Sequence, residues 1–300
     1  MKHYFKKRAN ALKNPEPYLG GSPWQESFKR LLKNKSAIAG LAIFVLICLS
    51  CVFAPFITRW DYESIDIHNV LSFTAPGHAW GTDKLGRDVL ARILYGGRIT
   101  LRISLTAAAM AAVVGTVIGL LAGYFGGWVD FWVSRFMDIL ASIPAFLLTI
   151  VVETAFGWAT GKFVYALAIA ATPQFARLMR VSVMNIMGRE YIEASRALGV
   201  SHFGVVWRHV LHNAAAPMLV HLTTCIAETI LNCTLMGYLG IGINPPTPEW
   251  GVLVAESKSF IRANPLITFL RCLPVTLSVI SINFFGNGFR DALDPRESSL

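Results

Sequence analysis

Residues 103–127 read ISLTAAAMAAVVGTVIGLLAGYFGG, a run of 25 residues without an ionisable side chain. At about 1.5 Å of rise per helical residue, roughly 20 residues cross the ~30 Å hydrocarbon core of a bilayer, so this run is long enough to span it. Residues 36–57 (SAIAGLAIFVLICLSCVFAPFI) form a second uncharged run, of 22 residues. Together the two runs predict an integral membrane protein.

The composition of the whole chain agrees with these two runs. Of its 300 residues, 54% are hydrophobic and only 15% are charged, and the mean hydropathy is +0.51. In a typical soluble globular domain, about a quarter of the residues are charged. The first apolar run follows 35 residues of basic tail, which is much longer than the basic start of a signal peptide, so we interpret residues 36–57 as a retained helix.

The net charge of +9 is unevenly distributed, since nine of the 27 Lys and Arg residues lie in residues 1–35. Basic residues directly before a membrane span keep that end of the chain in the cytoplasm. We find no basic face interleaved with aromatic residues, and therefore expect no nucleic acid as a partner. The five cysteines lie within or beside apolar segments without ligand-spaced partners, so we expect packing residues and no metal or other cofactor.

The apolar segments predict an all-α membrane protein with about six transmembrane helices and both termini in the cytoplasm. The expected helices are 36–57, 100–123, 131–152, 163–180, 213–236 and 269–289. We divide the chain into a cytoplasmic tail (1–35), a first helix with an extracytoplasmic loop (36–98) and a core domain (99–300). With this topology the inside segments carry more Lys and Arg than the outside ones, as the positive-inside rule requires.

Residues 58–98 hold as many acidic as basic side chains, which suits an outside loop. Within them Thr82 or Asp83 is placed to cap a helix. Leu85, Val89 and Ile93 then recur every four residues and make one apolar stripe. We therefore predict an amphipathic helix lying at the outer membrane interface.

The cytoplasmic loop 181–212 is the most informative segment. Residues 189–198 are good helix formers, and Gly199 is suited to the left-handed conformation that ends a helix. Ser201 offers a hydroxyl to cap a second helix that begins near His202. We predict a short helix-turn-helix that protrudes into the cytoplasm, with small side chains at Ala194 and Ser195 on its flank.

Several motifs resemble one known family along nearly the whole chain. Glu193-Ala-Ser-x-x-x-Gly199 resembles the Glu-Ala-Ala-x-x-x-Gly loop in the permease subunits of bacterial ABC importers. Other motifs resemble the second permease type of the oligopeptide, dipeptide and nickel branch of these importers. These motifs are Gly81-Thr-Asp-x-x-Gly86-Arg87-Asp88, Ala122-Gly-Tyr-Phe-Gly-Gly-Trp128-Val-Asp130, Leu239-Gly-Ile-Gly-x-x-Pro245-Pro-x-Pro-x-Trp250-Gly251 and Phe289-Arg290-Asp291-Ala-Leu-Asp294-Pro295.

The resemblance implies the type I permease fold of ABC importers in a bacterial plasma membrane. It also implies a second permease, two ATP-binding subunits that hold ATP and Mg, and an extracytoplasmic binding protein. In such permeases the loop that matches Glu193, Ala194, Ser195 and Gly199 docks on the ATPase and couples hydrolysis to the membrane helices. Short peptides are the expected substrate; nickel, a metallophore complex and glutathione remain alternatives within the branch.

Three positions depart from the pattern of the family. Ser195 replaces the usual alanine of the loop, which is a small change. His212 follows Leu211 where proline is common, and this difference affects how the fifth helix begins. Asn287 stands where aspartate is common, with a consequence that the sequence does not reveal.

Glu228 is the strongest single candidate for a functional residue, because an ionised group near the middle of a membrane helix is costly unless it is paired or faces water. Asn232 lies one turn later and His221 two turns earlier, so all three share one helix face. They are candidates for lining the translocation path. A structural hydrogen bond between helices and a metal site are the alternatives.

Two other classes of function compete with the permease interpretation. A membrane enzyme needs a nucleophile with its base, or a set of metal ligands, and we identify neither at membrane depth. A secondary carrier commonly shows internal repeats with broken helices near the midplane. In such a carrier the protruding cytoplasmic loop would have no function.

Overall fold

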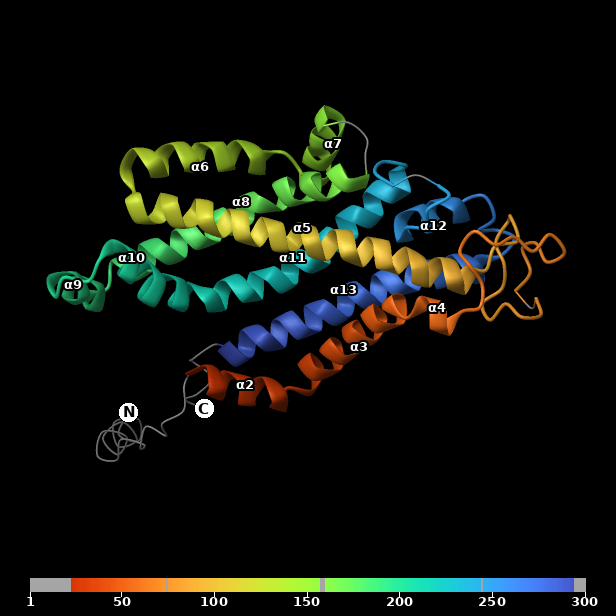
Figure 1. Ribbon diagram of the computed structural model, residues 1–300, viewed down its shortest axis with the longest axis horizontal. Helices are drawn as coiled ribbons and strands as arrows, with labels where there is room; N and C mark the ends of the chain where they lie inside the picture. Colours follow the sequence, from red (N-terminus) through yellow and green to blue (C-terminus); the bar gives the residue numbers. More distant parts are fainter. Residues whose placement is uncertain (1–22, 74, 157–159, 244, 294–300) are drawn as a thin grey trace, which may run out of the picture.

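The computed structural model describes residues 23–73, 75–156, 160–243 and 245–293. These residues form an elongated bundle of helices whose long axis follows α5 (Figure 1). The helices in chain order are α2 (Pro23–Lys33), α3 (Lys35–Val52), α4 (Ala54–Ile57), α5 (Val89–Phe125), α6 (Gly127–Ser142), α7 (Ala145–Phe156), α8 (Thr160–Met187), α9 (Glu190–Ala197), α10 (His202–Val205), the π-helix η1 (Val206–Leu211), α11 (His212–Leu239), α12 (Trp250–Ser257) and α13 (Pro265–Leu293).

Of the about six membrane passes expected from the sequence, four to five are found by length and composition in the described part of the chain. Four helical stretches are each long and apolar enough to cross a bilayer: α3, α5, the stretch His202–Leu239 and α13. The bent pair of α6 and α7 supplies a fifth pass. Helix α8 has 28 residues, or about 42 Å of length, which is long enough to cross a bilayer, but it is not among the helices that are also apolar enough.

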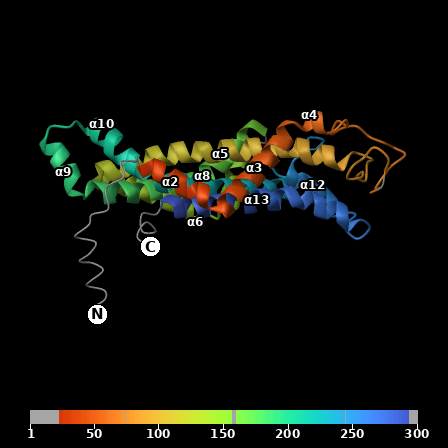
Figure 2. The ribbon, with the colours of Figure 1, turned by 90° about the horizontal axis from the view of Figure 1, so that it is seen from below.

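The two ends of the bundle carry different elements. The hairpin of α9 and α10 lies at one end of the long axis, while α12 and the loop of residues 58–88 lie at the other (Figures 1 and 2). Helix α3 packs along α13, which also contacts α11, and α5 packs along α8. The predicted tail 1–35 needs a correction, because its residues 23–33 form α2; residues 1–22 lie outside the described part.

Glycines on α5 bring it into close contact with α8. Gly115, Gly119 and Gly123 repeat every four residues and face the backbone of α8. A Cβ at Gly119 would lie 2.2 Å from the carbonyl oxygen of Ala176, far inside van der Waals contact. Small residues at this spacing let membrane helices approach closely, where dispersion replaces the hydrophobic effect as the main attraction.

The predicted interfacial helix is wrong. Val89 starts the single helix α5 of 37 residues, which absorbs both that segment and the expected helix 100–123. Asp88 caps it by accepting a hydrogen bond from the Ala91 N–H at 2.6 Å. Val89 and Ile93 are buried rather than turned toward lipid, and Trp250 of α12 donates its indole N–H to the carbonyl of Ile93 at 3.0 Å. The apolar stripe covers a protein core.

The predicted helix 131–152 is not one continuous helix. The structure divides this segment into α6 and α7, which meet at an angle of 99°. Pro144 lies between them, and Ile143 before it has extended backbone angles of φ −90° and ψ 128°. Proline lacks an N–H and disfavours the helical conformation of the preceding residue, so the helix ends there.

Candidate functional site

Within the predicted loop 181–212, residues 190–205 fold as the sequence predicts, into two short helices separated by a tight turn. The bounds of the loop need a correction, because residues 181–187 continue α8 and residues 206–212 continue into η1 and α11. Gly199 has φ +81°, the left-handed conformation that glycine adopts most easily. The Val200 N–H returns to the carbonyl of Ser195 at 3.2 Å and closes the end of α9. Ser201 then caps α10 by accepting a hydrogen bond from the Gly204 N–H at 3.2 Å.

The exposed surface of this hairpin combines small side chains and large apolar side chains with charged ones. Glu193 and Ala194 are exposed and Ser195 is half-buried, with the Ser195 hydroxyl donating to the carbonyl of Tyr191 at 2.8 Å. Leu198 is 85% exposed and Phe203 is 75% exposed. Large apolar side chains that protrude beyond the membrane helices mark a surface for contact with another protein.

The inner surface of the hairpin is anchored to the membrane helices. Ile192, Val205 and Val210 are fully buried in an apolar cluster that includes Met179 and Val183 of α8. The hydroxyl of Tyr124, in the last turn of α5, lies 2.5 Å from Nδ1 of His202. The guanidinium of Arg196 stands 6.0 Å from the centroid of the Tyr124 ring. A displacement of the hairpin therefore acts directly on α5 and α8.

The hairpin also continues into α11 without a break. Helical backbone runs from His202 to Leu239. The expected helix 213–236 is therefore continuous with the second helix of the hairpin. A π-helical segment, Val206–Leu211, joins the two parts, and His212 continues the helix where proline is usual in the resembled family. Pro217 within α11 has no N–H to donate, so the backbone ladder is weakened close to the membrane surface.

The three candidate path residues occupy different environments. Glu228 is exposed on the surface of the single chain and Asn232 is half-buried. His221 packs edge-on against Phe175 of α8, with ring centroids 4.5 Å apart. Its Nε2 has no hydrogen-bond partner among the described residues, and the ring lines a cavity of about 440 Å³ together with Arg290 of α13. No described group of His, Cys, Asp and Glu is arranged to hold a metal ion.

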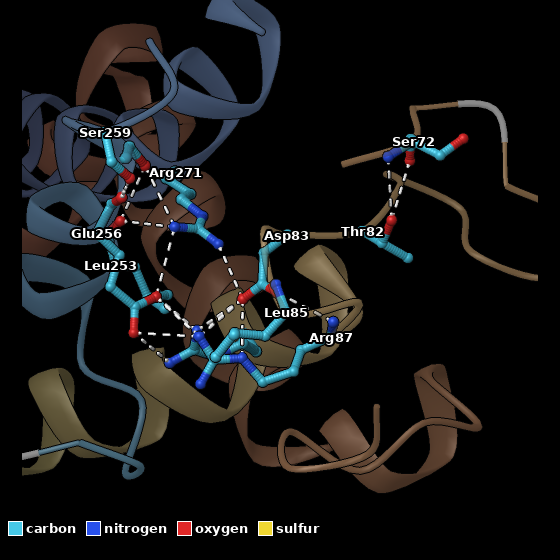
Figure 3. A network of polar contacts seen from close by, with 11 residues as sticks. Ser72, Thr82, Asp83, Leu85, Arg87, Leu253, Glu256, Ser259 and Arg271 are labelled. Carbon is cyan, nitrogen blue, oxygen red and sulfur yellow. Dashed lines mark hydrogen bonds and ion pairs between the residues drawn. The ribbon is translucent and has the colours of Figure 1, made fainter. Parts of the chain in front are cut away.

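A buried network of charges at the opposite end of the bundle was not predicted (Figure 3). The Asp83 carboxylate accepts hydrogen bonds from Arg87 at 2.8 Å and from Arg92 at 3.0 Å, and lies 3.5 Å from Arg271. Glu256 of α12 contacts the same three arginines, with its shortest distance, 2.6 Å, to Arg92. The network joins the outer loop to α5, α12 and α13.

Asp83, the most buried acid of this network, has a lowered pKa. Burial raises the pKa of Asp83, but hydrogen bonds from the backbone N–H groups of Arg87 and Leu85, and the charges of Arg87 and Arg92, more than offset it, so the pKa lies below its usual value. Sequence analysis placed Asp83 and Arg87 in a motif, but Glu256 lies 173 positions after Asp83. The charge balance of segment 58–98 was the only signal of internal pairing.

The fold and the sequence both match known transport proteins. Residues 115–299 match the family described as "Binding-protein-dependent transport system inner membrane component". The chain belongs to this family. Residues 22–76 of the permease match a second family, described as "N-terminal TM domain of oligopeptide transport permease C". The permease is therefore a multi-pass protein of the inner membrane, and it serves a transport system that depends on a binding protein.

Similar proteins of known name span nearly the full permease. The "Dipeptide transport system permease protein DppC" of Alkalihalophilus pseudofirmus is 37% identical, covering 97% of this chain and 98% of that protein. The "Di/tripeptide transport system permease protein DppC" of Pseudomonas aeruginosa is 36% identical, covering 92% and 93%. The "Glutathione transport system permease protein GsiD" of Escherichia coli is 33% identical, covering 96% and 95%.

The architecture is shared with solved transporter structures. One chain of the MetNI methionine ABC transporter in an inward-facing conformation aligns with a TM-score of 0.54 at 20% identity, covering 67% of this permease and 96% of that chain. A chain of an amino acid ABC transporter aligns with a TM-score of 0.52 at 15% identity, covering 67% and 93%. The permease thus has the type I fold of ABC importers, as the sequence resemblance implied.

Proposed function

We propose that this permease forms half of the membrane path of an ATP-driven importer for short peptides. It pairs with a second, similar permease, two ATP-hydrolysing subunits that hold ATP and Mg, and an extracytoplasmic binding protein. Both termini and the hairpin of residues 190–205 face the cytoplasm. The observation that carries the proposal is this hairpin: it exposes the large apolar side chains of Leu198 and Phe203, and its buried surface is fixed to three long membrane helices.

The contacts of the hairpin support a role in transmitting force. Its exposed side chains Leu198 and Phe203 offer an apolar surface to a partner, and Ala194 and Ser195 let a partner approach the backbone closely. Its buried side chains pack against α5, α8 and α11. Motion of an ATPase bound to this surface would therefore reorient the membrane helices, while the permease itself carries out no chemistry.

Peptides are the substrate class that the relatives favour. Two similar permeases are named for dipeptides and tripeptides, while the glutathione permease of Escherichia coli is similar at a lower identity. Glutathione is the second candidate, because it is itself a tripeptide derivative. Nickel and metallophore complexes remain expectations from the sequence resemblance alone.

Glu228, Asn232 and His221 are the residues that we propose to line the path. Glu228 turns away from the interior of the single chain, where only lipid, water or the second permease meets it. A carboxylate is tolerated at this depth where it faces water or a partner rather than lipid. Replacement of Glu228 by Gln is expected to reduce peptide uptake and to change its pH dependence. Unchanged uptake and pH dependence in this variant would exclude the path role.

The coupling role is tested by Gly199→Val in the assembled importer. Valine is strained at φ +81°, so the turn between α9 and α10 distorts. Gly240→Val is the matched control, since Gly240 has φ +79° and, like Gly199, has open space around the added Cβ, but lies at the far end of α11. We expect Gly199→Val to insert normally and to lose peptide uptake, whereas Gly240→Val retains most of it.

The measurement is uptake of a labelled dipeptide into vesicles that contain the complete importer, with ATP hydrolysis followed in parallel. Loss of uptake in both variants would mean that backbone strain anywhere disables the protein. Normal uptake by Gly199→Val would contradict the proposal. A cysteine at Ala194 should also cross-link to an ATP-hydrolysing subunit, and failure of this cross-link in an active complex would refute the docking surface.

A further inference from the structure

A charged cavity lies between α5, α6 and α8, apart from the hairpin and from the proposed path residues. Its volume is about 680 Å³, and its lining includes three arginines and two aspartates. These residues are Asp130, Arg135, Asp138, Arg177 and Arg180. Five ionisable side chains around one cavity at membrane depth are costly unless they serve a ligand or a water-filled space.

The ion pairs in the cavity leave one positive charge over. Arg180 binds Asp130 with two hydrogen bonds, one of them 2.6 Å long between Nη2 and Oδ2. Arg177 donates to Asp138 at 2.9 Å. Arg135 forms no ion pair with any described residue, and its guanidinium carbon stands 5.5 Å from the ring centroid of Phe131. The cavity therefore has a net charge of +1 and suits an anion.

The cavity opens at the level of the inner membrane surface. Helix α6 starts at Gly127, directly after the cytoplasmic end of α5. Asp130 and Arg135 follow at about 4 Å and 12 Å along the axis of α6. Arg135 reaches back over Phe131, toward the start of the helix, as a long basic side chain does when it extends to the headgroup region.

An apolar surface continues from the cavity along α6. A second hollow, of about 280 Å³, is lined by Gly127, Trp128 and Phe131. Trp128 is 77% exposed and Trp132 is 63% exposed, and Phe136 and Ile139 extend the same exposed surface toward the membrane centre. Tryptophan gathers at the membrane–water interface because one part of its ring system is apolar and the other donates a hydrogen bond.

We propose that this cavity binds the phosphate-bearing headgroup of an anionic phospholipid of the inner leaflet. Arg135 and the exposed guanidinium of Arg177 contact the phosphate, and the acyl chains lie along Trp132, Phe136 and Ile139. A basic pocket between helices on the cytoplasmic side, next to an aromatic belt, has the charge and shape that such a headgroup requires. A peptide fits less well, because both described carboxylates are already paired and leave none for its ammonium group.

The inference rests on the inward orientation of the hairpin end given under the proposed function. The test uses the complete purified importer in lipid nanodiscs of phosphatidylcholine with added phosphatidylglycerol, and counts bound lipids by native mass spectrometry. Arg135→Gln should weaken phosphatidylglycerol binding roughly tenfold, the size expected from losing one charge-assisted contact. The control Arg102→Gln removes an exposed guanidinium of α5 that does not line the cavity and should change nothing.

A third variant tests the sign of the charge. Asp138→Asn frees Arg177 and should maintain or strengthen lipid binding, whereas loss of binding in this variant would contradict an anion site. Equal binding of phosphatidylcholine, or displacement of the lipid by excess inorganic phosphate, would overturn the lipid assignment. Cross-linking of Trp132→Cys to the second permease, without bound lipid, would show that protein covers this face. Dipeptide uptake by the same wild-type importer, reconstituted into closed vesicles, shows independently whether the proposed function fails.

Discussion

Glu256→Gln is expected to destabilise the permease strongly, because it leaves three buried arginines with one carboxylate. In the native network Glu256 lies 2.6 Å from Arg92, 3.2 Å from Arg87 and 3.6 Å from Arg271. Arg92 and Arg271 are fully buried. Removing one partner from a buried ion pair typically costs about 3–5 kcal/mol, because the remaining charge is left uncompensated.

The measurement is the apparent unfolding midpoint of the purified importer on heating. Since 1 kcal/mol shifts the midpoint of a protein of this size by roughly 2–4 °C, Glu256→Gln should lower it by about 10 °C. Glu63→Gln removes an exposed carboxylate from the outer loop and serves as the control. We expect this control to shift the midpoint by less than about 2 °C, the effect of about 0.5 kcal/mol at an exposed position.

The double variant Glu256→Gln with Arg92→Gln tests the charge argument itself. It restores the net charge of +1 that the native network has, with Asp83 still facing Arg87 and Arg271. The double variant should therefore be more stable than the sum of the two single effects predicts, by about 1–3 kcal/mol. Strict additivity, or a single variant that unfolds at the wild-type temperature, would refute the view that these five groups act as one unit.

Three further predictions concern the contact of α5 with α8, the titration of Asp83 and the contact of Tyr124 with the hairpin. Gly119→Ala should destabilise the α5–α8 contact by about 1–3 kcal/mol, because the added Cβ meets the carbonyl of Ala176. Gly161→Ala is the control, since the space around its added Cβ is open. Equal unfolding midpoints for the two variants would contradict the packing argument. Because the pKa of Asp83 is lowered in the folded state, its stabilising effect is complete above about pH 4 and is lost as the pH falls through that lowered value. Midpoints measured between neutral and acidic pH should therefore fall less steeply in Asp83→Asn than in the wild type, and parallel curves would argue against the ionised network. Tyr124→Phe removes the hydroxyl that lies 2.5 Å from His202 and should cost only about 1 kcal/mol of stability. If this contact couples the hairpin to α5, the variant should hydrolyse more ATP for each peptide imported. Uptake and hydrolysis assays in the complete importer measure this ratio, and an unchanged ratio would exclude the coupling role.

Local features of the fold followed from local sequence signals. Gly199 and Ser201 each determine backbone geometry within a few positions of themselves, so the turn and the cap of the hairpin were predicted correctly. The apolar runs near residues 36–57 and 103–127 likewise predicted membrane helices, since the length needed to cross a bilayer is a property of one segment. The assignment of Gly199 to coupling came from the resemblance and stays a proposal.

The missed features depend on contacts between distant segments. The stripe of Val89 and Ile93 has the same spacing whether it faces lipid or Trp250, which lies 157 positions after Ile93. Pro144 lies inside the predicted helix 131–152, and the sequence around it does not give the angle of the bend. The buried arginines look like ordinary loop and helix-end charges until α12 and α13 bring Glu256 and Arg271 beside Asp83.

The uninterrupted length of α5 has a mechanical consequence. Its 37 residues extend about 55 Å, nearly twice the thickness of the hydrocarbon core, with the charge network at one end and Tyr124 at the other. A rigid helix of this kind that pivots near its middle tilts as a whole, so a swing at the Tyr124 end appears at the end with the charge network in the opposite direction. We expect the changes of shape at the π-helical segment and Pro217 of α11 and at the bend between α6 and α7, with α5 as the stiff helix around which they move.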